Sequence, residues 1–197
     1  MNTVTDLILA GALAAIWLTA ALLVEGLPTA QCASELRRRS GLLSMLVGAG
    51  AAVFVTVPVI TGLVPGASAA PAAALLPAIP AMVVLTVSVR RLTQVRRGAG
   101  AFATAPGTPV PPGLRAAAAH PLVAAPVQVT GLATLVGLPI AAGVVTVPGS
   151  DIAGIAITIV GVAVVAIAIR AALRHSRLSV RVVAPLKRAP RELTKVG

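Results

Sequence analysis

The sequence predicts an all-α membrane protein, a bundle of about five transmembrane helices with its N-terminus outside the cell and its C-terminus inside. The chain is 57% hydrophobic and only 11% charged over 197 residues, and its mean hydropathy is +0.99. Twenty-one charged residues cannot cover the surface of a soluble domain of this size. The other two observations are five long apolar runs and a one-sided distribution of basic residues.

The five apolar runs cover residues 7–24, 42–64, 69–89, 124–147 and 152–169. Each is about as long as the 17 to 25 residues that a helix needs to cross a hydrocarbon core of about 30 Å. Backbone amides find no water inside lipid, so a spanning segment is either a helix or part of a closed barrel. Barrel strands alternate in polarity over about ten residues, whereas these runs are continuously apolar. The sequence therefore predicts five helices in a domain of residues 1–173.

The first run is predicted to stay in the mature protein as a helix. A secretory signal begins with basic residues, but the segment "MNTVTD" has none and carries Asp6. Basic residues follow the run instead, as expected for an anchor whose N-terminus lies outside.

Within the second, third and fourth runs, prolines interrupt the helical pattern. Each removes a backbone donor and tends to kink its helix. The kinks either shape the packing of the bundle, which we favour, or break helices around a substrate site as in transporters. The prolines are Pro58, Pro77, Pro80, Pro126 and Pro139.

All 16 basic residues lie on one set of alternating connections. Residues 25–41, 90–123 and 170–197 hold three, five and eight of them, while the N-terminus and residues 65–67 and 148–150 hold none. Basic loops stay in the cytoplasm, so this distribution predicts the orientation and a multi-pass location in the plasma (inner) membrane. The arginines nearest the spans are predicted to fix the topology and to bind anionic lipid head groups, at about 1 kcal/mol per residue. They are Arg37, Arg38, Arg39, Arg90, Arg91, Arg96 and Arg97.

The same composition argues against other classes of function. A charge of +11 suggests nucleic acid, but two Phe, one Trp and no Tyr leave few side chains on which bases could stack. No acid lies in the middle of a span, where it would indicate an ion pathway. No catalytic set, metal cluster or phosphate-binding loop is present, and a haem between His120 and His175 would need the two rings opposed across the cofactor. We expect no nucleic-acid partner, no cofactor, no metal and no enzymatic activity.

Two polar features stand out against this background. The only polar cluster in a span is Gln128, Thr130 and Thr134, and its spacing favours bonds between helices over a single site. Cys32 lies in a predicted cytoplasmic connection and, as the one cysteine, cannot form an internal disulfide.

A basic tail is predicted to occupy residues 174–197. Its segment "RLSVRVV" at 177–183 alternates polar and apolar residues, a strand-like period. An isolated strand is unstable, so we expect this segment to dock on a partner or on the membrane surface. The docking residues would be Arg177, Leu178, Val180, Arg181 and Val182.

One resemblance adds to this interpretation. The richness in Ala, Val, Gly and Pro and the use of Arg over Lys resemble actinobacterial membrane proteins. The segment "HPLVAAPVQVTGLATLVGLPIAAG" at 120–143 resembles the mycobacterial accessory membrane subunits of Mce-type lipid importers. It covers the last two predicted helices, includes no diagnostic motif and transfers no site residue. It implies an auxiliary role in lipid transport, beside the permease and ATPase of an ABC-type importer.

Two classes of function follow. In the first, which we favour, the protein is an accessory subunit of a larger membrane complex, because its spans lack ionisable groups and its tail is predicted to dock on a partner. In the second it is a small oligomeric carrier or channel for a hydrophobic or neutral solute. The prolines favour this class, as does a faint repeat between residues 46–58 and 135–148.

Overall fold

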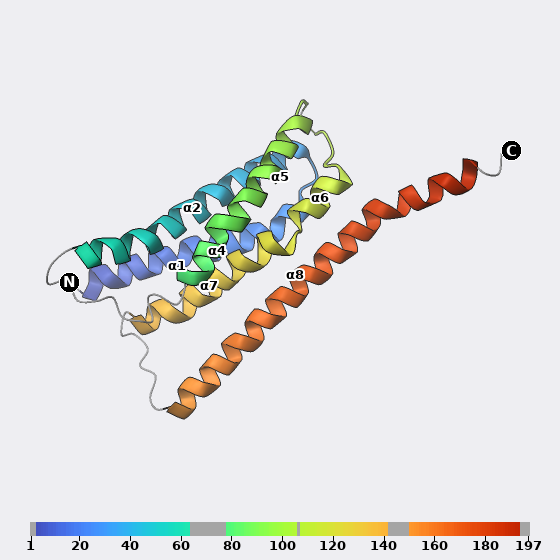
Figure 1. Cartoon of the computed structure of the whole chain (residues 1–197). Helices are drawn as coiled ribbons and strands as arrows, with labels where there is room; N and C mark the ends of the chain where they lie inside the picture. The colour runs from blue at the N-terminus through green and yellow to red at the C-terminus, as the bar shows by residue number, and fades with distance from the viewer. Residues whose placement is uncertain (1–2, 64–77, 106, 142–149, 194–197) are drawn as a thin grey trace.

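The computed structural model describes residues 3–63, 78–105, 107–141 and 150–193, and these ranges are almost entirely helical (Figure 1). The regular elements they contain are α1 (Thr3–Gly26), the 3-10 turn η1 (Leu27–Thr29), α2 (Ala33–Leu63), α4 (Ala78–Val83), the π-helical turn η2 (Val84–Ser88), α5 (Val89–Phe102), α6 (Pro112–Ala118), α7 (Pro121–Ala141) and α8 (Ser150–Leu193). One isolated antiparallel bridge joins Cys32 to Pro109. The predicted all-α class is confirmed.

Three helical segments are long and apolar enough to cross a membrane, namely Gly11–Thr29, Pro112–Ile140 and Thr158–Val182. They overlap the first, fourth and fifth predicted spans, with bounds that differ by several residues. The second predicted span lies in α2 apart from residue 64, and the third begins among residues 64–77, outside the described part of the chain. Residues 142–147 of the fourth span also lie outside it. The structure thus supports a membrane protein, and the count of five spans and their orientation stay predictions.

Four long helical segments form the bundle: α1, α2, α7 and the continuous run α4–η2–α5 (Figure 1). Helix α1 packs against α2 and α7, and α2 packs against α5. The last turn of α1, the last turn of α5 and the helix α6 lie at one end of this bundle, so the basic connections 25–41 and 90–123 meet there (Figure 1). The core is built mainly of Leu, Val and Ala, with Trp17 fully buried at its centre and stacked on Phe54 at a centroid distance of 5.9 Å.

Close packing at Trp17 depends on a glycine of α2. A Cβ atom placed on Gly50 would lie 2.8 Å from the indole Nε1 of Trp17, closer than such atoms approach. Small residues that let helices approach one another are the main packing device in lipid, where apolar burial alone gives little driving force. The close approach of α2 to Trp17 thus requires glycine at position 50.

One of the predicted kinking prolines is compensated by a neighbouring helix. Pro126 lacks an amide hydrogen, which leaves the carbonyl of Leu122, four residues earlier in α7, without its helical donor. The hydroxyl of Ser88, the last residue of the π-helical turn, donates to this Leu122 oxygen at 2.7 Å. Ser88 is fully buried, so the bond satisfies a hydroxyl that lipid and water do not reach and gives the Leu122 carbonyl the donor that Pro126 lacks. At Pro126 the packing interpretation fits the structure.

The strand-like prediction for residues 177–183 is wrong, because they belong to α8. Alternation over so few positions is a weak signal, and an isolated strand leaves its backbone groups unpaired, whereas a helix satisfies them internally. Helix α8 also continues through the predicted domain boundary at residue 173 without a break.

Candidate functional site

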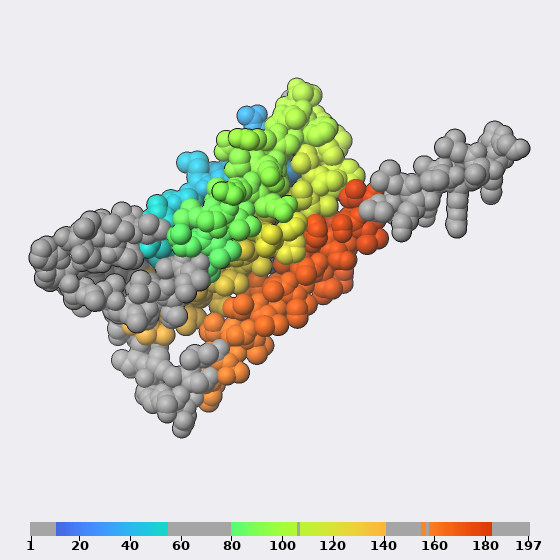
Figure 2. Space-filling view, in the orientation of Figure 1, coloured from blue at the N-terminus to red at the C-terminus, as the bar shows by residue number. Residues whose placement is uncertain are grey.

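Helix α8 lies at the edge of the bundle, where it packs on α6 and α7. Figure 2 shows it as a separate orange-to-red band along one side of the molecule. Only 6% of its apolar, membrane-spanning stretch is buried, against 33% for each of the other two candidate spans. Most of the α8 surface is therefore available to lipid or to a partner.

Large apolar side chains follow one exposed face of α8, which we call the outer seam. Their spacings of four, three and seven residues repeat every two helical turns, as at the contact positions of a coiled coil. Their exposed fractions range from 54% to 65%. The outer seam consists of Ile155, Ile159, Val162, Ile169, Leu173 and Val180.

A polar junction ties α8 to the bundle. The Glu25 carboxylate of α1 accepts a hydrogen bond from the Gln128 side chain of α7 at 3.1 Å. The same oxygen lies 3.1 Å from the Arg170 guanidinium of α8. The Glu25 side chain is two-thirds buried, with 33% exposed, and a partly buried carboxylate needs such donors. This junction joins the three helices α1, α7 and α8.

A second contact joins α8 to the start of α7. The imidazole rings of His120 and His175 lie with centroids 4.8 Å apart. The Nδ1 atom of His175 donates to the carbonyl of Ala116 at 3.1 Å, and His120 Nδ1 accepts from the Leu122 amide at 3.2 Å. The rings touch each other directly, so no haem fits between them. Among the residues that the structure describes, no three His, Cys, Asp or Glu side chains are placed to hold a metal ion.

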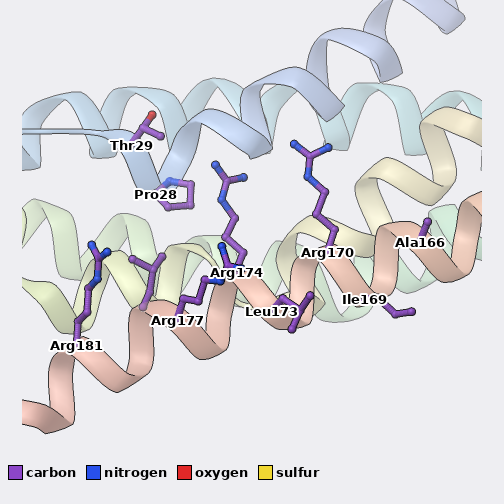
Figure 3. Close-up of a pocket in the computed structure, with 10 residues that line it drawn as sticks. Pro28, Thr29, Ala166, Ile169, Arg170, Leu173, Arg174, Arg177 and Arg181 are labelled. Carbon is purple, nitrogen blue, oxygen red and sulfur yellow. The ribbon is translucent and has the colours of Figure 1, made fainter.

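A groove of about 760 Å³ lies between the C-terminal half of α8 and the turn η1 (Figure 3). We call it the arginine groove, because four arginines spaced four, three and four residues apart line it. In the close-up, the side chains of Arg170, Arg174 and Arg181 extend from α8 toward the side of Pro28 and Thr29. The lining residues are Pro28, Thr29, Ala166, Ile169, Arg170, Leu173, Arg174, Arg177, Leu178 and Arg181.

The residues predicted to dock a partner are divided between different faces of α8. Arg177, Leu178 and Arg181 line the arginine groove, Val180 belongs to the outer seam, and Val182 is half-buried. The alternation in the sequence placed them on two faces of a strand, whereas the helix distributes them around its axis.

The predicted topology anchors lie on two helices at the basic end of the bundle. Arg37 and Arg38 are exposed on the first turns of α2, and Arg90, Arg91, Arg96 and Arg97 are exposed on α5. Arg39 differs from them. It donates to the carbonyl of Gly26 at 2.7 Å and pairs with Glu35, so it closes the connection between α1 and α2.

Sequence reasoning identified Gln128 as a residue that bonds between helices, and its bond to Glu25 confirms this. Thr130 and Thr134 instead bond to carbonyls of their own helix. The pairing of Glu25 with Arg170 was missed, although a signal existed. Each residue directly follows a predicted span, and both spans end on the same side, so opposite charges meet at one depth.

No family model, no curated protein and no solved structure matches the chain. The resemblance to accessory subunits of Mce-type importers accordingly stays a prediction.

Proposed function

We propose that this protein is an accessory subunit of the plasma membrane that docks on a larger membrane protein complex through the outer seam of α8. In this proposal five helices cross the membrane, with the N-terminus outside. The observation that carries it is the outer seam, a heptad-spaced row of large apolar residues that the bundle does not cover.

Lipid alone can cover an apolar helix, so exposure by itself does not indicate a protein partner. The sizes of the exposed side chains of α8 distinguish a partner helix from lipid. Beside the large residues of the seam, α8 exposes the small residues Gly161, Ala168 and Ala172. Small residues let a second backbone approach closely, and large ones at heptad positions fill the spaces that remain. Such a surface suits another helix better than fluid acyl chains. On the resemblance of residues 120–143, an Mce-type lipid importer is one candidate for the complex.

A carrier or channel is the competing function. The π-helical turn η2 supports it, since such turns often occur at functional sites. However, the buried Ser88 of this turn is already bonded to Leu122, and the buried hydroxyls of Thr130 and Thr134 bond within α7. These groups contribute to packing rather than line a path for a polar solute.

The test measures the size of the native assembly. Membranes solubilised in mild detergent should release the protein within a particle much larger than its own 19.5 kDa. Replacing Ile159→Trp and Val162→Trp keeps α8 apolar but should prevent docking, so the protein should be released as a small species. The matched control is Met45→Trp on α2, at a position 74% exposed, which should leave the assembly intact.

One outcome would contradict the accessory function. If the wild-type protein is purified only as a small homo-oligomer and transports a solute in liposomes, it is a carrier.

A further inference from the structure

We propose that the arginine groove binds one anionic phospholipid, with its phosphate on Arg174, Arg177 and Arg181 and an acyl chain along Ala166, Ile169 and Leu173. The inference goes beyond the docking function and requires only that the protein is a membrane protein.

The first argument is uncompensated charge. At spacings of four, three and four residues, the four arginines lie on one face of α8. Arg170 has Glu25 at 3.1 Å. The only other ion pair among the described residues joins Arg39 to Glu35, so Arg174, Arg177 and Arg181 face the groove without an acid. Like charges held this close repel one another, and a bound anion relieves that repulsion.

The second argument is the type of cation. A guanidinium presents a planar fork of donors that matches two phosphate oxygens at once, while an ammonium acts as a point charge. Three such forks on one helix face are well suited to a phosphate group. Figure 3 shows Arg174 and Arg181 reaching across the groove toward η1 rather than lying along α8.

The third argument is the apolar half of the groove. Its lining changes along α8 from Ala166, Ile169 and Leu173 to arginine, and Ile169 and Leu173 are each 54% exposed. The change occurs where the predicted span 152–169 ends, and the proposal expects lipid head groups at this depth. An amphiphile with one anionic head and a hydrocarbon tail covers both halves, whereas free phosphate or an acidic peptide uses the arginines alone. The volume of about 760 Å³ is also within the usual range for a small-molecule site.

The other arginines provide a matched comparison. Arg96 and Arg97 on α5 are also exposed but do not line this groove. Replacing them removes general positive charge from the same end of the bundle and leaves the site intact.

The experiment uses the full chain in a neutral detergent and counts bound lipid by native mass spectrometry during titration with phosphatidylglycerol or phosphatidylcholine. The wild type should bind one phosphatidylglycerol at least about tenfold more tightly than phosphatidylcholine, given about 1 kcal/mol per basic residue. The triple variant Arg174→Gln, Arg177→Gln, Arg181→Gln should lose this preference. Arg96→Gln with Arg97→Gln removes two general lipid anchors and should lower the preference by less than the triple variant does, because neither residue lines the groove.

Two further arms identify the ligand. Leu173→Asn should weaken phosphatidylglycerol binding, and inorganic phosphate at equal concentration should not displace the lipid. Should the triple variant fail to fold, Arg177→Lys replaces it, since this change keeps the charge, loses the fork and should still lower the affinity.

Equal binding of both lipids, or an unchanged preference in the arginine variants, would overturn the proposal. Displacement by inorganic phosphate would assign the groove to a free anion. If the arginine variants lose a co-purified acidic protein but keep the lipid, the groove binds a protein. Either result also overturns the phospholipid proposal. Ile169 and Leu173 belong to both the outer seam and the groove. The docking test replaces Ile159 and Val162, which lie outside the groove, so failure of the docking function leaves this result interpretable.

Discussion

The hydroxyl of Ser88 donates to the carbonyl of Leu122 across 34 residues of sequence, at a distance of 2.7 Å. It supplies the hydrogen bond that Pro126 cannot give to its own helix. A residue of the π-helical turn η2 therefore compensates for the hydrogen bond that a proline removes from α7.

This relationship predicts a coupled pair of mutations. Ser88→Ala should destabilise the protein by about 1 kcal/mol, the net value of such a hydrogen bond, because it leaves the Leu122 carbonyl without a donor. In a Pro126→Ala background the amide of residue 126 can bond to Leu122, so the same substitution should cost less. Thermal unfolding of the four proteins in one detergent measures the coupling. Additive effects would show that Ser88 stabilises the helix in some other way.

The contact between Gly50 and Trp17 predicts an asymmetry between two glycines of α2. Gly50→Ala should lower the unfolding temperature, at a cost of about 1–3 kcal/mol, because its Cβ would lie 2.8 Å from the Trp17 ring. Gly48→Ala is the control, since nothing lies within 4 Å of its Cβ position and alanine favours a helix. Equal effects of the two substitutions would contradict the packing described here.

Cys32 should react with thiol reagents at a lower pH than an ordinary cysteine. The Ser34 hydroxyl, and then the Glu35 amide, donate hydrogen bonds to the sulfur and lower the pKa of the Cys32 thiol. A lower pKa raises the fraction of thiolate, the reactive form, at any pH below it. Ser34→Ala should move the pH profile of maleimide labelling upward. An unmoved profile would mean that the hydroxyl does not act on the sulfur.

The predicted orientation is tested with the same chemistry in intact cells. In a Cys32→Ser background, a cysteine placed at Asn2 or Ser150 should react with an impermeant thiol reagent. In the wild type, Cys32 should stay protected until the membrane is opened. Strong labelling of Cys32 in sealed cells would reverse the orientation.

The outcomes for particular residues show how far the sequence can predict this molecule. Helical structure follows from long apolar runs, because lipid leaves the backbone few alternatives. The prediction at residues 177–183 was wrong because these residues lie beyond the apolar run. Over so few positions, an alternation of polar and apolar residues is compatible with a strand and with a helix. The Ser88–Leu122 bond depends on the depth at which α7 lies against η2, which no local pattern encodes. The arginine groove likewise requires the position of α8 beside η1, although the spacing of its four arginines is visible in the sequence.

The unbroken course of α8 has a mechanical consequence. Its 44 residues make a rod of about 66 Å, at 1.5 Å per residue, roughly twice the hydrocarbon thickness of a bilayer. The part beyond His175, which is bonded to Ala116, is a stiff lever about 27 Å long by the same rise, and Figure 1 shows the end of α8 projecting past the bundle. A tilt of about 10° at the His175–Ala116 contact would displace its far end by about 5 Å, by the same geometry. A small tilt of α8 in the membrane would thus be amplified at the end of this lever.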